Sequence, residues 1–141
     1  MQVVVFSKLL KEEDIPHIQN LFDALHEEGI NAYVYGPYLE QLRNEINFKR
    51  DVGVFEGYLD FSVKKFDFFI TLGGDGTILA ALTHIRDSNV PILGINLGRL
   101  GFLASIEKKR IHEAVGLLKN GRYAIDERRL LYLESNLPVF G

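Results

Sequence analysis

The sequence feature that most constrains the fold is a glycine-rich turn set between two apolar segments. Residues 68–72 are apolar or β-branched, a pattern typical of a strand that is buried on both faces of a parallel sheet. The turn GGDG follows at residues 73–76, and residues 77–86 then carry apolar side chains at helical spacing. A strand, a tight turn and a helix in this order favour an open α/β sheet, in which ligands bind beyond the carboxyl ends of the strands.

The composition of the turn favours phosphate as its ligand. The N-terminus of the following helix offers free N–H groups and the positive end of the helix dipole, and both attract phosphate. The glycines of the turn allow the backbone to approach a ligand closely. The charged residue of the turn is Asp75. Its carboxylate would repel a phosphate group, so a metal ion or a reacting hydroxyl group is expected beside it.

The rest of the chain continues the alternation of strands and helices. Besides the central strand, strands are expected at residues 2–6, 30–35, 90–96 and 123–134. Helices are expected at residues 15–28, 38–46, 77–86 and 107–119. Residues 47–62 show no clear periodicity, and we interpret them as a loop or an irregular insertion. The order of elements predicts an α/β fold with a doubly wound, mostly parallel sheet.

Several details of the helices can be predicted as well. Asp14 is the expected N-cap of the first helix, and Gly29 is expected at its left-handed C-terminal position. The charged runs at residues 11–14 and 108–110 are interpreted as solvated faces. The helix after the glycine turn is expected to bury the apolar residues Ile78, Leu79, Leu82 and Ile85.

Composition excludes several classes of function. The net charge of −3 gives no general attraction to nucleic acid or to an anionic membrane, so neither is expected as a partner. The chain contains no cysteine, which excludes disulfides, thiolate zinc sites and cysteine nucleophiles. The four histidines lack the spacing of metal ligands and are interpreted as structural. No apolar run reaches the length of a membrane span, and we expect a cytoplasmic protein.

The end of the chain predicts a second domain. Residues 123–134 resemble a strand with two arginines beside leucines, and residues 135–141 add apolar side chains without a local partner. An apolar strand with an open edge is normally covered in natural proteins. We therefore expect an α/β nucleotide-binding domain at residues 1–121, and at residues 122–141 the beginning of a truncated C-terminal β domain.

Two motifs carry a resemblance to a known family. The turn GGDGT at residues 73–77 resembles the signature shared by NAD kinases, diacylglycerol- and sphingosine-type lipid kinases and 6-phosphofructokinases. The segment NLGRLGFL at residues 96–103 resembles the N-x-G-x-x-G-F-L motif of NAD kinases, and it lies at a similar distance from the first motif. Residues 121–131 resemble the segment by which NAD kinases enter their C-terminal β domain. The whole resemblance covers about residues 65–133.

This resemblance implies the transfer of the terminal phosphoryl group of ATP to the 2′-hydroxyl of the adenosine ribose of NAD. Asp75 would be the catalytic base and would help to place Mg²⁺ with ATP. The other residues that would bind the nucleotide are Gly74, Gly76, Thr77, Asn96 and Phe102. In the family the adenine is held by an Asn-Glu or Asn-Asp pair in the C-terminal β domain further downstream, which this chain does not contain. A homo-oligomer is expected for the full-length protein.

Alternatives remain open at this point. Asp75 could be only a helix cap, while Thr77, Asn96 and Phe102 could be structural residues, and Arg99 is interpreted as a solvated loop residue. A diacylglycerol-type lipid kinase is a second enzymatic function, although the proline-containing motif of that family is absent. A nucleotide-binding module without catalysis is a third possibility.

Overall fold

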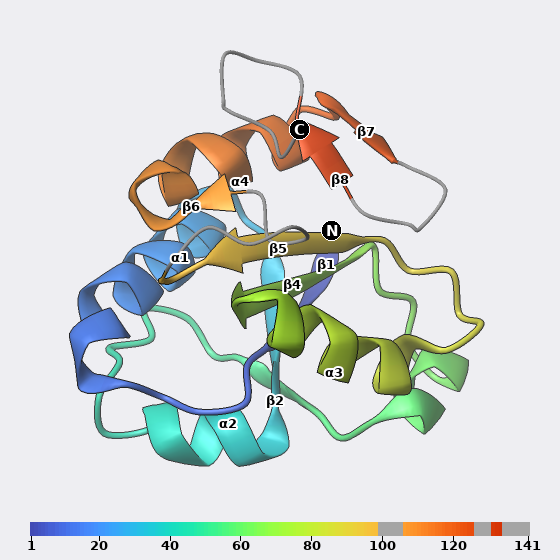
Figure 1. Cartoon of the computed structure of the whole chain (residues 1–141), viewed down its shortest axis with the longest axis horizontal. Helices are drawn as coiled ribbons and strands as arrows, with labels where there is room; N and C mark the ends of the chain where they lie inside the picture. Colours follow the sequence, from blue (N-terminus) through green and yellow to red (C-terminus); the bar gives the residue numbers. More distant parts are fainter. Residues whose placement is uncertain (99–105, 126–130, 134–141) are drawn as a thin grey trace.

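The structure is a computed structural model that describes residues 1–98, 106–125 and 131–133, and its centre is a parallel sheet (Figure 1). Six strands lie in the order β3-β2-β1-β4-β5-β6, and every neighbouring pair is parallel. The strands are β1 Gln2–Phe6, β2 Asn31–Tyr35, β3 Gly53–Phe55, β4 Phe68–Gly73, β5 Ile92–Asn96 and β6 Ile106–Glu107. The predicted doubly wound α/β class is confirmed.

Helices cover both faces of the sheet. They are α1 Ile15–Glu27, α2 Gly36–Leu42, α3 Asp75–Ile85 and α4 Ile111–Lys119, with 3-10 turns at Glu12–Asp14, Tyr58–Ser62 and Lys108–Arg110. The helices α1, α2 and α4 pack on the face that carries Val3 and Val5, and α3 packs on the opposite face with Val4 and Phe6. Both faces of β1 are therefore buried, which explains its continuous apolar sequence.

The strand order creates a crevice between β1 and β4. From β1 the chain moves outward through β2 to β3, and it then crosses over to β4 and moves outward in the other direction through β5 to β6. The carboxyl ends of β1 and β4 are therefore neighbours, but the segments that follow them leave in different directions. Such a topological switch point is where open α/β sheets bind their ligands.

The structure corrects the sequence prediction for residues 47–62. It contains the edge strand β3 and a 3-10 turn, and β3 pairs with β2 through Val34 and Val54. Three residues are too few for a periodic pattern, and the tertiary packing of Phe55 holds the strand in place. An irregular insertion is therefore wrong for this part of the chain.

Other differences concern the bounds and faces of elements. Residue 107 belongs to β6 and the helix α4 begins only at Ile111, because the pairing with β5 continues past Ile106. In α3, Leu79 and Leu82 are 56% and 43% exposed, contrary to prediction. The helix instead buries the narrower stripe Thr77, Ile78, Ala81 and Ile85.

The last part of the chain forms a small separate sheet. The predicted single strand at residues 123–134 is two strands, β7 Tyr123–Ile125 and β8 Leu131–Leu133, which pair antiparallel. The ring of Tyr123 contacts that of Phe68 edge-on, with the centroids 5.1 Å apart. The division of the chain into domains at residue 121 stays a prediction. Within the described ranges, no helix has both the length and the apolar character to cross a membrane.

Candidate active site at the switch point

A hollow of about 360 Å³ lies at the switch point, beyond the carboxyl ends of β1, β4 and β5. The segment after β1, the glycine turn with the start of α3, and the end of β5 form its walls. The residues that line it are Ser7, Lys8, Leu9, Lys11, Glu13, Asp14, Leu72, Gly73, Gly74, Thr77, Asn96, Leu97 and Gly98. Its size falls in the range of small-molecule sites, which begins at roughly 300 Å³.

The glycine turn is held in a conformation that requires glycine at position 73. Gly73 has φ of +151°, and a Cβ atom added to it would collide with the hydroxyl group of Thr77. Gly74 has φ of −123° and has open space where its Cβ would be. The carbonyl of Gly74 accepts hydrogen bonds from the N–H groups of Thr77 and Ile78, which closes the first turn of α3. The helix therefore begins at Asp75, two residues earlier than its apolar pattern predicts.

These two glycines make a matched pair for a folding experiment. Gly73→Ala is expected to lower the free energy of unfolding by about 1–3 kcal/mol, because the backbone is strained for alanine and the added methyl group meets Thr77. Gly74→Ala is expected to leave the stability unchanged or slightly higher, because its conformation suits alanine. Chemical denaturation of both variants measures the difference. Equal stabilities would contradict the assignment of strain to Gly73.

The end of β5 closes the hollow beside the turn. Gly73 and Asn96 are partners in the β4–β5 register, and the N–H of Leu97 donates to the carbonyl oxygen of Gly73 over 3.2 Å. Asn96 is buried, and its Oδ1 accepts a hydrogen bond of 2.8 Å from the N–H of Gly98. This bond fixes the start of the second loop, so Asn96 has at least a structural role there.

The segment after β1 forms the opposite wall. The Ser7 hydroxyl donates a hydrogen bond of 2.6 Å to the carbonyl oxygen of Leu72, which ties the ends of β1 and β4 together. Lys8 follows and is exposed, and its Nζ would lie 3.8 Å from a Cβ atom added to Gly76. The ammonium group of Lys8 therefore lies beside the first turn of α3.

Asp14 contributes a buried carboxylate to the same wall. Only 6% of the residue is exposed, and its carboxylate makes no hydrogen bond to any residue that the structure describes. Burial raises the pKa of Asp14, and the nearby Glu13 raises it further, while Lys108 and Lys11 act in the opposite direction. The prediction of Asp14 as a capping residue on a solvated face is wrong. It occupies the N-cap position, but its side chain caps nothing and lines the hollow instead.

The layer below this wall is also polar. The hydroxyl group of Tyr38 is buried close to Ser7 and has no hydrogen-bond partner in the described part of the chain. Burial raises the pKa of Tyr38, and the charge of Asp14 raises it further, so the hydroxyl stays protonated at neutral pH.

The burial of Asp14 leads to a prediction about pH. Its pKa is higher in the folded state than in the unfolded state, so its contribution favours folding most below the ordinary value of 3.8 and is lost as the pH rises through the folded pKa. Asp14→Asn removes the cost of a buried charge. The variant is therefore expected to be more stable than the parent at pH 7, and the gain should shrink as the pH falls toward the ordinary pKa of 3.8.

The control for this measurement is Glu12→Gln, which removes the same charge from an exposed neighbour in the same 3-10 turn. Denaturation curves at several pH values compare the two variants with the parent. A gain of equal size for both, or a gain for Asp14→Asn that does not depend on pH, would mean that burial of the carboxylate is not the cause.

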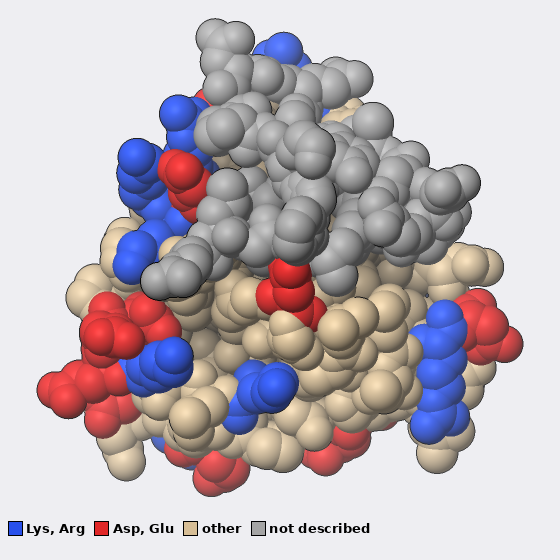
Figure 2. Space-filling view, viewed as in Figure 1, with Lys and Arg blue, Asp and Glu red and all other residues tan. Residues whose placement is uncertain are grey.

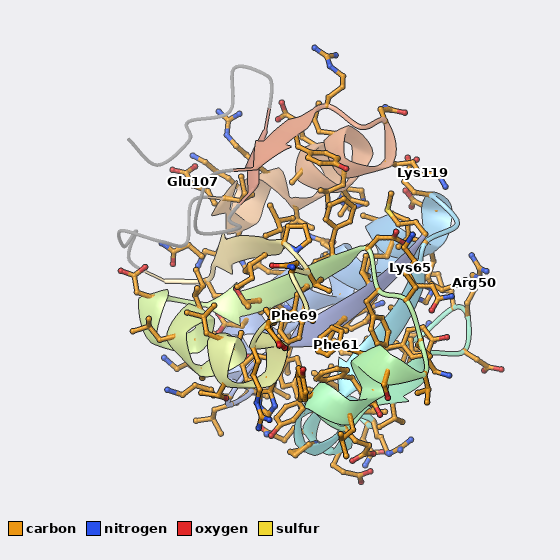
Figure 3. The ribbon with its side chains drawn as sticks, turned by 90° about the vertical axis from the view of Figure 1, so that its right-hand side faces the viewer. Arg50, Phe61, Lys65, Phe69, Glu107 and Lys119 are labelled. Atoms are coloured by element: carbon orange, nitrogen blue, oxygen red, sulfur yellow. The ribbon has the colours of Figure 1, made fainter. Side chains whose placement is uncertain are left out.

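A larger hollow, of about 770 Å³, lies at the amino ends of the strands, opposite to the switch point. It is lined by residues 58–66 and 87–91, which precede β4 and β5 and so lie at the amino ends of these strands. Lys65 lies at the amino ends of the strands, and Glu107 lies at the carboxyl end of β6. In Figure 3 these two residues are on different sides of the molecule. The larger hollow has neither the glycine turn nor the start of a long helix, so the smaller hollow is the better candidate for phosphate chemistry.

The distribution of charged side chains on the surface agrees with a phosphate site that is confined to a small part of the molecule. On the face shown in Figure 2, basic and acidic side chains lie in small groups, in several of which the two signs adjoin, and other residues separate most of these groups. In the part of the chain that the structure describes, no group of three or more histidine, aspartate or glutamate side chains could hold a metal ion.

The structure brings together most of the residues singled out in the sequence. Gly74, Thr77 and Asn96 line the hollow, and Asp75 and Gly76 form the first turn of α3 beside it. Phe102 and Arg99 lie outside the described residues. The roles of these residues in binding and catalysis stay predictions.

Sequence reasoning missed the wall that follows β1. Lys8 and Asp14 line the hollow, and Lys108 donates a hydrogen bond of 3.2 Å to the carbonyl oxygen of Leu97 at its rim. The runs that contain Asp14 and Lys108 are therefore not simply solvated. The available signal was the fold class itself, because a doubly wound sheet places the end of its first strand at the switch point.

Comparisons with known proteins agree with this geometry. Residues 3–123 match the family model of the ATP-NAD kinase N-terminal domain. The chain is 34% identical over 134 residues to an NAD kinase of Flavobacterium psychrophilum, covering 95% of this chain and 45% of that protein. It is 35% identical over 132 residues to an NAD kinase of Cytophaga hutchinsonii, with 93% and 44% covered.

The fold is similar to that of a solved structure. A crystal structure of yeast NADH kinase complexed with NADH matches with a TM-score of 0.72 at 23% sequence identity, over 86% of this chain and 38% of that one. At this level of identity the likeness concerns the fold alone. The chain spans about half the length of the curated relatives it matches.

Proposed function

The chain belongs to the NAD kinase family, and from this premise we propose that it provides the nucleotide-binding site for the phosphorylation of NAD to NADP. The reaction would transfer the terminal phosphoryl group of ATP to the 2′-hydroxyl of the adenosine ribose of NAD. The observation that carries the proposal is the position of the GGDGT turn at the switch point, where it starts a helix beside the loop that begins at Asn96.

The site supports a division of roles around the turn. Gly74 and Gly76 would let the backbone approach the ribose and the phosphates, and the N-terminus of α3 lies beside the same space. Thr77 lines the hollow with its side chain against Gly73 and offers a hydroxyl group to phosphate. Asn96 holds the second loop, and with Phe102 of that loop it would bind the adenosine side of NAD.

Asp75 is the proposed catalytic base. In the reaction the ribose oxygen forms a new bond to the terminal phosphorus, the bond from this phosphorus to the bridging oxygen breaks, and ADP leaves. The proton of the ribose hydroxyl passes to the carboxylate of Asp75. Catalysis of phosphoryl transfer depends mainly on positioning and charge neutralisation, which a helix N-terminus and nearby lysines supply.

Magnesium is proposed as the ion that accompanies ATP. The residues fit it, because Asp14 presents a buried carboxylate without a hydrogen-bond partner among the described residues, and Asp75 lies at the start of α3. Mg²⁺ is commonly held by one or two carboxylates together with phosphate oxygens. When bound, it would neutralise charge on the phosphates. A cytoplasmic location and a homo-oligomer of the full-length protein belong to the same proposal.

The test is the formation of NADP from NAD and Mg-ATP, detected with an NADP-specific dehydrogenase. The assay is run on this chain and on an extended version that has the full length of the curated relatives. Turnover is expected only with the extended version, because the chain spans about half the length of its relatives. If the extended version is folded and forms no NADP, the proposed function is wrong, and phosphorylation of diacylglycerol becomes the next assay.

A further inference from the structure

The glycine turn is tied to its two neighbouring strands by hydrogen bonds of two kinds. On the β5 side, the backbone N–H of Leu97 donates to the carbonyl oxygen of Gly73 over 3.2 Å. On the β1 side, the hydroxyl group of Ser7 donates to the carbonyl oxygen of Leu72 over 2.6 Å. The bond to β1 is therefore made by a side chain, and a substitution can remove it without changing the backbone.

Ser7 stands where the pairing of β1 with β4 ends. The last paired residues are Phe6 and Thr71, and the carbonyl group of Leu72 lies one residue beyond them. The side chain of Ser7 donates to this carbonyl where a longer strand would have offered a backbone N–H. Ser7 is 4% exposed, and a buried carbonyl without a donor costs as much as a lost hydrogen bond. The hydroxyl group therefore lets the two strands diverge at the crevice without leaving this carbonyl unpaired.

The same bond fixes the peptide that leads into the strained glycine. The carbonyl group of Leu72 and the N–H group of Gly73 belong to one planar peptide unit, so a bond to the first orients the second as well. Gly73 has φ of +151°, and a rotation of this peptide would move the residues that follow it. Asp75 comes two residues later, at the first position of α3. The hydroxyl group of Ser7 thus influences the position of Asp75, although Ser7 follows a different strand.

The hydroxyl group of Ser7 is not available as a donor to a ligand. Ser7 lines the hollow, but a serine hydroxyl has one proton to donate, and in Ser7 this proton is used in the bond to Leu72. A role in holding the turn is therefore favoured over a hydrogen bond from Ser7 to a phosphate group.

We propose that Ser7 is a positioning residue: its hydroxyl group holds the peptide between Leu72 and Gly73 and thereby keeps Asp75 in line with the reacting hydroxyl group. The proposal rests on the proposed function, in which Asp75 is the base, and extends it to a residue outside both glycine-rich motifs. A positioning role predicts a loss of turnover with little loss of affinity, because a misplacement of about 1 Å can cost roughly 10²-fold in rate.

The first experiment measures kcat for NADP formation by the extended protein, together with its affinities for NAD and for Mg-ATP. Ser7→Ala is expected to lower kcat roughly 10–100-fold and to change both affinities by no more than a few fold. Ser7→Cys nearly keeps the volume of the side chain but offers only a weak donor, so a similar loss of kcat is expected. Parent-like turnover of Ser7→Cys would mean that Ser7 only fills space, and the proposal would be wrong.

Ser62→Ala is the matched control. The hydroxyl group of Ser62 donates to the carbonyl oxygen of Leu59 over 2.7 Å, in the 3-10 turn that precedes β4 at the amino ends of the strands. The variant loses the same kind of bond at the end of the sheet opposite to the crevice, and it is expected to turn over as the parent does. An equal loss of kcat in both variants would assign the effect to general destabilisation and would overturn the proposal.

The second experiment asks whether Ser7 acts through Asp75. Residues that act as a unit in one step have non-additive effects on the rate. In the Asp75→Asn background, Ser7→Ala is therefore expected to change the residual kcat by no more than a few fold. If Ser7→Ala lowers kcat by the same factor in both backgrounds, Ser7 acts independently of Asp75, which contradicts the proposal.

The parent protein separates this proposal from the proposed function. No NADP from the folded parent rejects the proposed function and, with it, the role of Ser7. NADP from the parent together with parent-like kcat of Ser7→Ala rejects only the role of Ser7. If Ser7→Ala does not fold, Ser7→Cys takes its place in both experiments, because it keeps the packing of the buried side chain.

Discussion

Asp75→Asn is expected to reduce the rate of NADP formation by the extended protein about 10²–10⁴-fold, the usual effect of removing a general base. Asparagine has nearly the shape of aspartate but cannot accept the proton of the ribose hydroxyl. Asp75 starts α3 at the switch point, and the backbone around it is fixed by hydrogen bonds to Gly73 and Gly74. The substitution should therefore leave the turn intact and act on the chemistry.

The measurement is kcat for NADP formation together with the affinities for NAD and for Mg-ATP. Loss of turnover with both affinities retained within a few fold supports a base. Asp51→Asn is the control, because it removes the same charge from an exposed position in the segment between α2 and β3. Unchanged turnover in Asp75→Asn would end the assignment of Asp75 as the base, and a large loss of affinity would point to a role in binding instead.

The central part of the fold could be predicted because its signals are local. A strand buried on both faces needs an uninterrupted apolar sequence, and β4 has one up to Gly73. The turn that follows must accommodate a backbone conformation and a close contact with Thr77 that only glycine allows. Both requirements are met by residues that are consecutive in the sequence. The strand, the turn and the helix could therefore be predicted from the sequence.

The faces of α3 could not be predicted because an apolar pattern does not say how wide the covered stripe is. The helix carries more apolar residues than the sheet beneath it covers, and Leu79 and Leu82 fall outside the contact. Helical spacing alone treats all apolar residues as equal, whereas burial depends on the neighbour across the interface.

One wall of the candidate site escaped prediction for a tertiary reason. Lys8 and Asp14 follow β1, and they meet the glycine turn only because β1 and β4 are neighbours in the sheet. Residues 7–14 and 72–77 are far apart in the sequence, and no local pattern connects them. The segment by itself resembles an ordinary charged loop before a helix, and the burial of Asp14 can be seen only in the folded chain.

The second prediction with a large expected effect concerns the edge strand β3. Phe55 is fully buried in the layer on the α3 side of the sheet, with its ring 5.4–5.8 Å from those of Phe61, Phe66 and Phe69. Figure 3 shows Phe61 and Phe69 on the ribbon in this layer. Phe55→Ala is expected to lower the free energy of unfolding by about 3–5 kcal/mol, because it removes a large buried ring and leaves a cavity among aromatic neighbours.

The neighbouring residue of the same strand provides the control. Val54 is 40% exposed and points to the other side of β3, so Val54→Ala is expected to change the free energy of unfolding by no more than about 0.5 kcal/mol. Urea denaturation of both variants distinguishes an ordered strand from a loose insertion. An insertion outside the core would tolerate both substitutions equally, whereas a strand that closes the aromatic layer makes the two differ by several kcal/mol and ties residues 47–62 to the stability of the whole sheet.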